Sequence, residues 1–361
     1  MKRIGIIVCV LLCLSLTGCS WMNGSFVSVE PYQEQLSGGQ SEALSAANYQ
    51  QLRLVLENLV EAGTENAVIS VAEYEQHLIE KGMETAVHHI RALLPLGAYA
   101  VEDVSYEIGT VGGEPAISVE IDYIHGRAEL RKVRRVGNME EAQMVITDAL
   151  AQCADGIVLL INQFSDMDLV QMVEDYALEN PNLVMEIPEV AVGLYPDSGN
   201  SRVVELKFTY QTSRDALRQM QTQVQRVFVS ASLYVSSDGE DSQRIMQLYT
   251  FLTERFDYQL QTSITPAYSL LCHGVGDSKA FASVFATMCR RDGLECMVIS
   301  GTCDGAPRFW NLIREGDIYY HVDLLRSKEQ GSLRLLTDEQ MTGYVWDYSA
   351  YPAAGSSTAD Q

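Results

Sequence analysis

The sequence predicts an α+β protein that contains two small repeated α+β units followed by a third unit of a different kind. The chain has 361 residues, of which 47% are hydrophobic, and this is enough for two or three separate hydrophobic cores. Apolar residues alternate in some short stretches, as in half-buried strands, and recur every three or four positions in others, as in amphipathic helices. Before residue 236 these patterns occur twice in the same order, which favours an internal duplication.

The first repeat unit is predicted over residues 47–136. Its strand before Tyr123 alternates polar residues with Ile117, Val119 and Ile121, which indicates one buried face. The predicted elements are a helix over 48–61, a strand over 67–71, a helix over 75–93, strands over 98–108 and 116–123, and a helix from Arg127.

The second repeat unit is predicted over residues 137–236. Its predicted elements are a helix over 139–152, a strand over 157–161, a helix over 166–178, strands over 183–194 and 202–210, and a helix from Arg214. At an offset of 87 residues, Tyr123 matches Tyr210 and Arg127 matches Arg214. Identity between the halves is low, so a duplication and similar patterning without common ancestry are both open.

The N-terminus has the pattern of an export signal. Lys2 and Arg3 precede an apolar run that is too short to span a bilayer, as in the core of a signal peptide. The Leu16-Thr17-Gly18-Cys19 ending resembles the bacterial lipobox. This resemblance implies that residues 1–18 are removed, that Cys19 carries a diacylglyceryl group, and that the protein is held extracytoplasmically at the bacterial cell membrane by lipid. An ordinary secretory cleavage site is the alternative.

Both ends of the mature chain are polar. Residues 19–46 are rich in Ser, Gly, Gln and Glu and are predicted to be a flexible tether between the lipid and the first folded residue. Residues 353–361 are small and polar and are predicted to be a disordered tail.

The net charge argues against two kinds of partner. The formal net charge is −23, and it becomes −25 when residues 1–18 are removed, because Lys2 and Arg3 are lost with them. So acidic a chain is not expected to bind nucleic acid, nor to adsorb electrostatically to anionic lipid.

The cysteines predict no metal site and no cofactor. Once the signal peptide is removed and Cys19 is acylated, five cysteines remain, and their spacings contain no CxxC pair. An exported protein could form one disulfide among the last four of them. The sequence does not choose the pair among Cys153, Cys272, Cys289, Cys296 and Cys303.

The most informative stretch lies in the third unit, predicted over residues 237–352. Gly274 and Gly276 form a turn that leads into a helix with apolar residues at i, i+3, i+4 and i+7. An apolar strand follows, then a strand containing Trp310-Asn311, then a strand ending in Tyr320-His321-Val322-Asp323.

This order resembles the transglutaminase-like (papain-related) core. In that family a Cys opens the helix, a His-Ala-Trp-Asn strand follows, and an Asp lies on the next strand. The thiolate attacks an acyl carbon, the imidazole moves the proton, and the carboxylate orients the imidazole. The resemblance places Ser278 at the nucleophile position, Arg308 at the imidazole position and Asp323 at the carboxylate position.

Two of the three catalytic positions are therefore altered, and no catalytic residues are expected. A guanidinium stays protonated and cannot act as a base at neutral pH, and a serine hydroxyl without a base is a poor nucleophile. The resemblance implies a surface lipoprotein whose domain keeps a groove, lined by Trp310 and Asn311, but has lost catalysis. Arg308 is predicted to pair with Asp323 where the imidazole would stand.

Other functions remain open at this level. A rearranged enzyme could use Ser278 with His273, or Cys303, for acyl transfer or peptide hydrolysis. His321 is not expected to take part. It lies about 7 Å along its strand from Asp323, too far for a hydrogen bond, and is predicted to be a partly buried strand residue.

A solute-binding lipoprotein is a third hypothesis. As a binding module, the groove would accept a peptide, a peptidoglycan stem or an envelope protein.

Overall fold

The computed structural model describes residues 44–355. The predicted signal peptide, Cys19, most of the predicted tether and the last six residues of the predicted tail lie outside the described residues. Within them, none of the helices combines the length and the apolar character that a membrane span requires.

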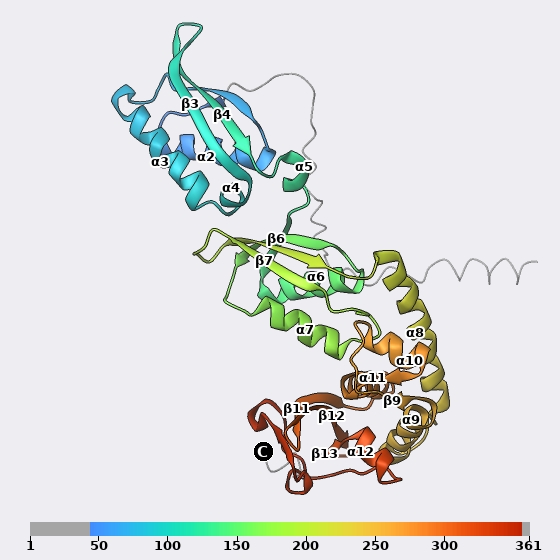
Figure 1. Ribbon diagram of the computed structural model, residues 1–361. Helices are drawn as coiled ribbons and strands as arrows, with labels where there is room; N and C mark the ends of the chain where they lie inside the picture. The colour runs from blue at the N-terminus through green and yellow to red at the C-terminus, as the bar shows by residue number, and fades with distance from the viewer. Residues whose placement is uncertain (1–43, 356–361) are drawn as a thin grey trace, which may run out of the picture. The chain divides into compact units, whose positions relative to one another are not determined.

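The first unit is a four-stranded sheet with helices against one face (Figure 1). The strand order is β1-β2-β4-β3, with β1 parallel to β2 and the other neighbours antiparallel. Leu52 and Met83 of the two long helices pack with Ile69 and Ile117 of the sheet, and all four side chains are buried. The elements are β1 (Leu44–Ser45), α2 (Tyr49–Ala62), β2 (Asn66–Ser70), η1 (Gln76–Leu78), α3 (Ile79–Ala92), α4 (Pro95–Ala100), β3 (Val101–Val111), β4 (Glu114–Tyr123) and α5 (Arg127–Leu130).

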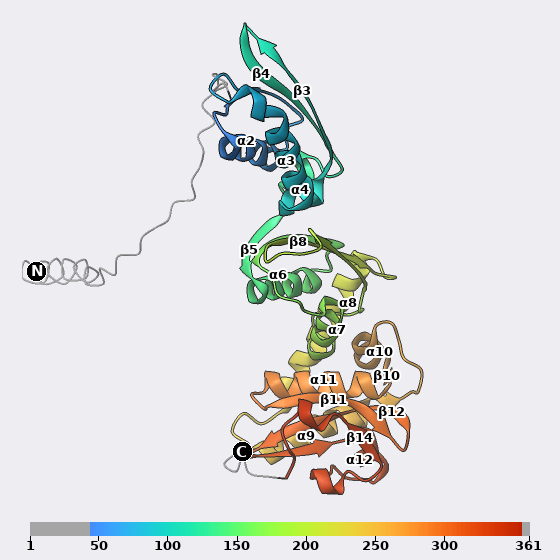
Figure 2. The ribbon, with the colours of Figure 1, turned by 90° about the vertical axis from the view of Figure 1, so that its left-hand side faces the viewer.

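The second unit contains another four-stranded sheet, with order β5-β6-β8-β7 and again one parallel pair, β5 with β6. Figures 1 and 2 show α6 and α7 on the same side of this sheet. Ile146 of α6 and Val173 of α7 pack with Leu159 and Val204 of the sheet in one buried cluster. The elements are β5 (Arg134–Asn138), α6 (Met139–Ala151), β6 (Gly156–Gln163), α7 (Leu169–Glu179), β7 (Glu189–Tyr195), β8 (Arg202–Thr209) and α8 (Arg214–Tyr234).

The two sheets have the same strand order and the same pattern of strand directions. Local details also match at an offset of 90 residues. Asn48 caps α2 and Asn138 caps α6, and each side chain accepts a hydrogen bond from an amide three residues on. The residues after these helices, Gly63 and Cys153, have φ angles of 62° and 50°, in the left-handed region.

The C-terminal unit has an antiparallel sheet with order β13-β12-β11-β14 and helix α11 on one face. Phe281, Val284, Phe285 and Met288 of α11 are all buried, as their spacing predicts. Its elements are α9 (Asp241–Arg255), β9 (Asp257–Tyr258), α10 (Pro266–His273), β10 (Val275–Gly276), α11 (Ser278–Arg291), β11 (Cys296–Cys303), β12 (Ala306–Glu315), β13 (Ile318–Val322), α12 (Leu324–Glu329), η2 (Asp338–Gln340), β14 (Tyr344–Trp346) and η3 (Tyr348–Ala350).

Several predicted boundaries of the units are wrong. Residues 134–136 were placed in the first unit, but β5 pairs with β6 of the second sheet. Helix α8 was placed in the second unit, but its buried face, which includes Val224 and Phe228, packs with α9, α10 and α11. The tether was extended to residue 46, but Leu44 and Ser45 pair with β2 and Ala46 is buried. The tail was started at residue 353, but Ala354 is buried and pairs with Tyr319.

Three predicted elements also differ. Residues 98–100 were predicted as strand but end helix α4, because Pro95 at the first helical position favours a helical turn. The predicted helix from Arg127 is a single turn, and strand β5 follows it. Residues 183–188 were predicted as strand but precede β7 without regular structure.

Candidate functional site

Ser278 is the first residue of helix α11, where the resemblance places the nucleophile. Asp277 caps this helix: one carboxylate oxygen accepts from the amide of Ala280 at 2.9 Å, and the other accepts from the Thr262 hydroxyl at 2.6 Å. The Ser278 Oγ accepts a hydrogen bond from the main-chain amide of Phe309 at 3.3 Å. The hydroxyl is therefore next to strand β12, and no imidazole among the described residues is hydrogen-bonded to it.

Arg308 and Asp323 form a bidentate ion pair, and this is the contact that the sequence predicts. The Arg308 Nε lies 2.8 Å from Asp323 Oδ2, and Nη2 lies 2.8 Å from Oδ1. The Asp323 side chain is 3% exposed and that of Arg308 is 17% exposed. Burial alone would lower the pKa of Arg308, but the hydrogen bond and charge of Asp323 raise it above its ordinary value, so the guanidinium stays charged.

The Asp323 carboxylate has three further donors. It caps α12, because Oδ1 accepts from the amides of Leu325 and Arg326 at 3.0 Å each. The Tyr344 hydroxyl donates to Oδ2 at 2.8 Å, and burial, together with the charge of Asp323, raises the pKa of this phenol. A carboxylate has about four acceptor positions, and here five donors converge on them. The carboxylate is saturated without an imidazole.

Tyr344 is a site residue that the sequence analysis missed. It lies on β14, which joins the sheet edge beside β11, and its Cα partner there is Cys303. The Tyr344-Val345-Trp346 alternation predicts a strand with one buried face, but nothing in that pattern reveals which strand it joins. Only the pairing of β14 with β11 brings this phenol to Asp323.

The sequence predicts that Trp310 and Asn311 line a groove, but both residues are buried in the interior. Trp310 is 1% exposed and Asn311 is fully buried. The Asn311 side-chain amide donates to the carbonyl of Ala282 at 2.8 Å, which ties β12 to helix α11. Both residues are therefore structural parts of the interior.

His321 is buried rather than partly buried, at 1% exposure, and it belongs to a separate polar chain. The Trp310 Nε1 donates to His321 Nδ1 at 3.0 Å, so that nitrogen is an acceptor. The other nitrogen, Nε2, lies 2.8 Å from Asp338 Oδ1 and carries the proton in this tautomer. Burial lowers the pKa of His321 despite the neighbouring Asp338, which favours the neutral imidazole.

The alternative nucleophile pairs are not assembled. His273 is exposed at the end of α10, and its ring packs edge-on against Tyr268 with centroids 4.9 Å apart. No hydrogen bond joins it to Ser278 among the described residues. Cys303 is half-buried, and its sulfur lies 3.9 Å from a carboxylate oxygen of Asp304, not beside a histidine.

The cysteines and acids also fail to form other centres in the described region. Residues 44–355 contain no group of three or more His, Cys, Asp or Glu side chains arranged to hold a metal ion. The five cysteines whose pairing the sequence left open are all free thiols. Burial raises the pKa of Cys289 well above its ordinary value, and the neighbouring Cys296 adds to this, which disfavours the thiolate form.

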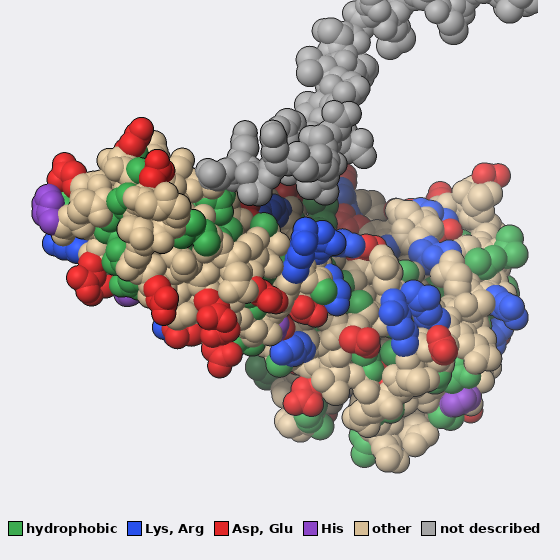
Figure 3. Space-filling view, turned by 90° about the horizontal axis from the view of Figure 1, so that it is seen from above, with side chains coloured by type: hydrophobic (Ala, Val, Ile, Leu, Met, Phe, Trp, Pro, Cys, Tyr) green, Lys and Arg blue, Asp and Glu red, His purple; other side chains and the backbone are tan. Residues whose placement is uncertain are grey.

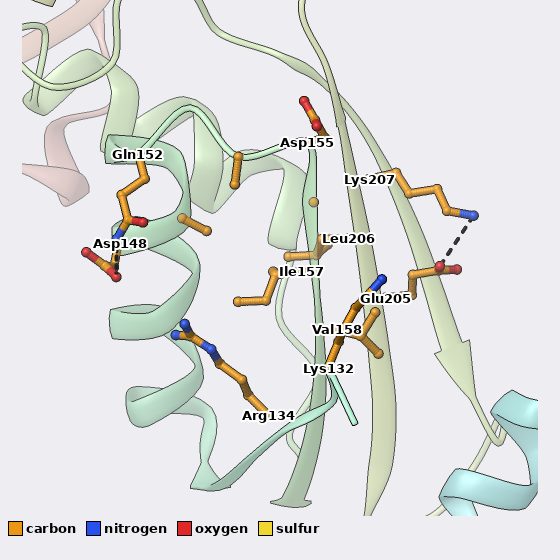
Figure 4. A pocket seen from close by; sticks show the side chains of 13 residues that line it. Lys132, Arg134, Asp148, Gln152, Asp155, Ile157, Val158, Glu205, Leu206 and Lys207 are labelled. Atoms are coloured by element: carbon orange, nitrogen blue, oxygen red, sulfur yellow. Dashed lines mark hydrogen bonds and ion pairs between the residues drawn. The ribbon is translucent and has the colours of Figure 1, made fainter. Parts of the chain in front are cut away.

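A cavity of about 440 Å³ lies between α6 and the sheet of the second unit (Figure 4). Lys132 and Arg134 reach it, but so do Asp148 and Asp155, and Lys207 pairs with Glu205 at 3.4 Å. On the face shown in Figure 3, acidic side chains predominate at the left, and most of the basic side chains lie further right. The cavity therefore has no field of one sign that would select an anion or a cation.

One family model matches the C-terminal unit. Residues 230–349 match the family model of the transglutaminase-like superfamily. Solved structures that resemble the chain include a TGase (10% identity, TM-score 0.28, covering 63% of this chain and 68% of that one). Another is a proposed cysteine protease from Cytophaga hutchinsonii (12% identity, TM-score 0.26, covering 44% of this chain and 70% of that one). A third is a proposed protease from Parabacteroides distasonis (8% identity, TM-score 0.24, covering 71% of this chain and 39% of that one).

These structures are only loosely similar to the whole chain, and no curated protein matches it. The family match starts within α8 and ends after β14, so it includes Ser278, Arg308, Asp323 and Tyr344. Residues 230–349 of this chain are a transglutaminase-like domain.

Proposed function

We propose that this protein is a membrane-anchored extracytoplasmic lipoprotein whose transglutaminase-like domain is a non-catalytic binding or scaffold module of the cell envelope. The proposal on catalysis rests on one observation, the saturation of Asp323. Arg308 takes both carboxylate oxygens, and Tyr344 and two amides take the remaining acceptor positions. The group that orients the general base in the family has here become the N-cap of α12 and half of an ion pair.

The chemistry at Ser278 supports the same conclusion. A serine needs a neighbouring base to become a nucleophile. Its nearest assigned partner is a main-chain amide, which donates to the hydroxyl oxygen and cannot remove its proton. The guanidinium of Arg308 stays protonated at neutral pH, so it cannot act as the base for Ser278 either.

An assay of acyl transfer tests the loss of catalysis. The purified chain is expected to incorporate no fluorescent amine into a glutaminyl peptide and to cleave no peptide bond above the buffer rate. Ser278→Ala and Cys303→Ser variants are measured beside it, because each removes one nucleophile of the rearranged-enzyme alternative. Turnover that disappears in either variant would show that the domain is an enzyme.

The proposal on location rests on the Leu16-Thr17-Gly18-Cys19 resemblance to the lipobox. The chain is expected to remain in the membrane fraction of a bacterial host, and a Cys19→Ala variant is expected to leave it, because one thiol carries the whole anchor. A Cys19→Ala variant that stays fully membrane-bound would remove lipidation from the account.

We also infer that the first two units are repeats of one α+β module. The equal strand order, the Asn caps and the left-handed residues after α2 and α6 support this. Such a pair presents large surfaces without catalytic groups, as suits a module that binds a peptide, a peptidoglycan stem or an envelope protein.

A further inference from the structure

The second unit has an open groove between helices α6 and α7. Its volume is about 530 Å³, which lies in the range of about 300–1,000 Å³ usual for ligand sites. Three methionines line it: Met144 is 61% exposed, Met167 is 38% exposed, and Met172 lies below them in the core. Methionine is unbranched and polarisable, and it is over-represented at surfaces that accept apolar side chains of varied shape.

The rim of this groove is acidic. Glu140 on α6 and Asp168, Asp175 and Glu179 on or next to α7 line it, and no Lys or Arg does. None of the four carboxylates forms an ion pair with any residue between 44 and 355. Arg290 approaches the end of α7 but donates to the main-chain carbonyl of Glu179, not to its carboxylate. Within residues 44–355, no side-chain cation therefore pairs with the rim carboxylates.

In the first unit, side chains join the corresponding pair of helices, α2 and α3. At the 90-residue offset that aligns the Asn caps, Thr147 and Glu179 correspond to Glu57 and His89. In the first unit His89 Nε2 lies 2.9 Å from Glu57 Oε1, which joins α2 to α3, and Arg53 pairs with the same oxygen at 3.4 Å. Thr147 and Glu179 cannot make such a bridge. The second unit therefore lacks the side-chain contact between helices that His89 and Glu57 make in the first unit, and a groove lies between its two helices.

We propose that the α6–α7 groove binds a basic amphipathic helix of a partner protein. The apolar stripe of such a helix, at i, i+3, i+4 and i+7, packs on the methionines, and its flanking Lys and Arg side chains meet the rim carboxylates. Charge complementarity selects this occupant over an acidic or neutral helix. The site is distinct from the altered transglutaminase-like centre and does not depend on whether that centre is catalytic.

Peptide binding to the full chain tests the assignment. The probes are two fluorescent amphipathic peptides of about 18 residues, one built from Leu and Lys and one with Glu in place of every Lys, compared by anisotropy. The Lys peptide is expected to bind, more weakly as salt rises, and the Glu peptide is not. The Glu140→Lys/Asp175→Lys variant is expected to weaken binding about tenfold or more, and Met144→Ser is expected to weaken it at every salt concentration.

A matched control separates the groove from the net charge of the chain. Glu80→Lys/Glu84→Lys on α3 alters the net charge equally, also at exposed positions, and is expected to leave binding unchanged. Equal loss in both double variants, equal binding of both peptides, or no binding of the Lys peptide would overturn the proposal. Self-association that Met144→Ser abolishes would assign the groove to a second copy of the chain and would also overturn it.

Discussion

Replacing Arg308 by Met is expected to destabilise the transglutaminase-like domain by about 3–5 kcal/mol, the usual cost of removing one partner of a buried ion pair. Asp323 is 3% exposed, so the variant leaves a buried carboxylate without its cation. Tyr344 and the amides of α12 cannot neutralise the charge. Urea-induced unfolding, followed by the fluorescence of Trp310 and Trp346, measures the change, because both indoles lie in this domain.

Arg314→Met is the matched control for this experiment. Arg314 also pairs with two carboxylates, those of Glu295 and Asp317, but on the protein surface. Exposed ion pairs contribute little, so its unfolding midpoint is expected to stay close to that of the unaltered protein. An Arg308→Met variant as stable as Arg314→Met would show that the Arg308–Asp323 pair is not structural.

The Ser278→Cys/Arg308→His double variant is expected to have a reactive thiol. Cys at position 278 would open helix α11, and His at position 308 would face Asp323, which already lies within 2.8 Å of the present side chain. A helix N-terminus and a neighbouring imidazolium both lower a thiol pKa. At about pH 6, alkylation by iodoacetamide is expected to be roughly tenfold faster than in Ser278→Cys alone.

The single variant is the control here, because it has the same thiol at the same helix position but keeps the guanidinium. The rate-versus-pH curve of the double variant is expected to be shifted to lower pH. Equal rates for the two variants over the whole pH range would mean that strand β12 does not present position 308 to position 278. The family geometry would then not apply to this chain.

The parts of the fold that depend on local pattern were predictable from the sequence. The i, i+3, i+4, i+7 spacing predicts helix α11 and its buried face. The order of the strands around Trp310 and Asp323 predicts which residues lie at the site. The ion pair between Arg308 and Asp323 could be predicted from the sequence. The resemblance places both residues at positions that lie side by side in the transglutaminase-like core, and their charges are opposite. These inferences need only periodicity and one motif.

The parts that depend on distant pairing were not predictable. Tyr344 reaches Asp323 only because β14 joins the edge beside β11, and three residues of strand do not reveal their partner. The sequence predicts that Trp310 lines a groove, but a hydrogen bond to His321 satisfies its indole nitrogen and allows complete burial. Strand β5 was missed because Arg134 and Arg135 lack strand-like alternation, and its parallel pairing with β6 forms it.

The most direct test of the central claim is nitrogen-15 NMR of the Arg308 guanidinium in the intact chain. The account predicts that the Arg308 Nε–H is protected from exchange with water and that Asp323→Asn removes this protection, since Asp323 Oδ2 accepts this hydrogen at 2.8 Å. An Arg308 Nε–H that exchanges as fast as those of surface arginines, and is unaffected by Asp323→Asn, would contradict it.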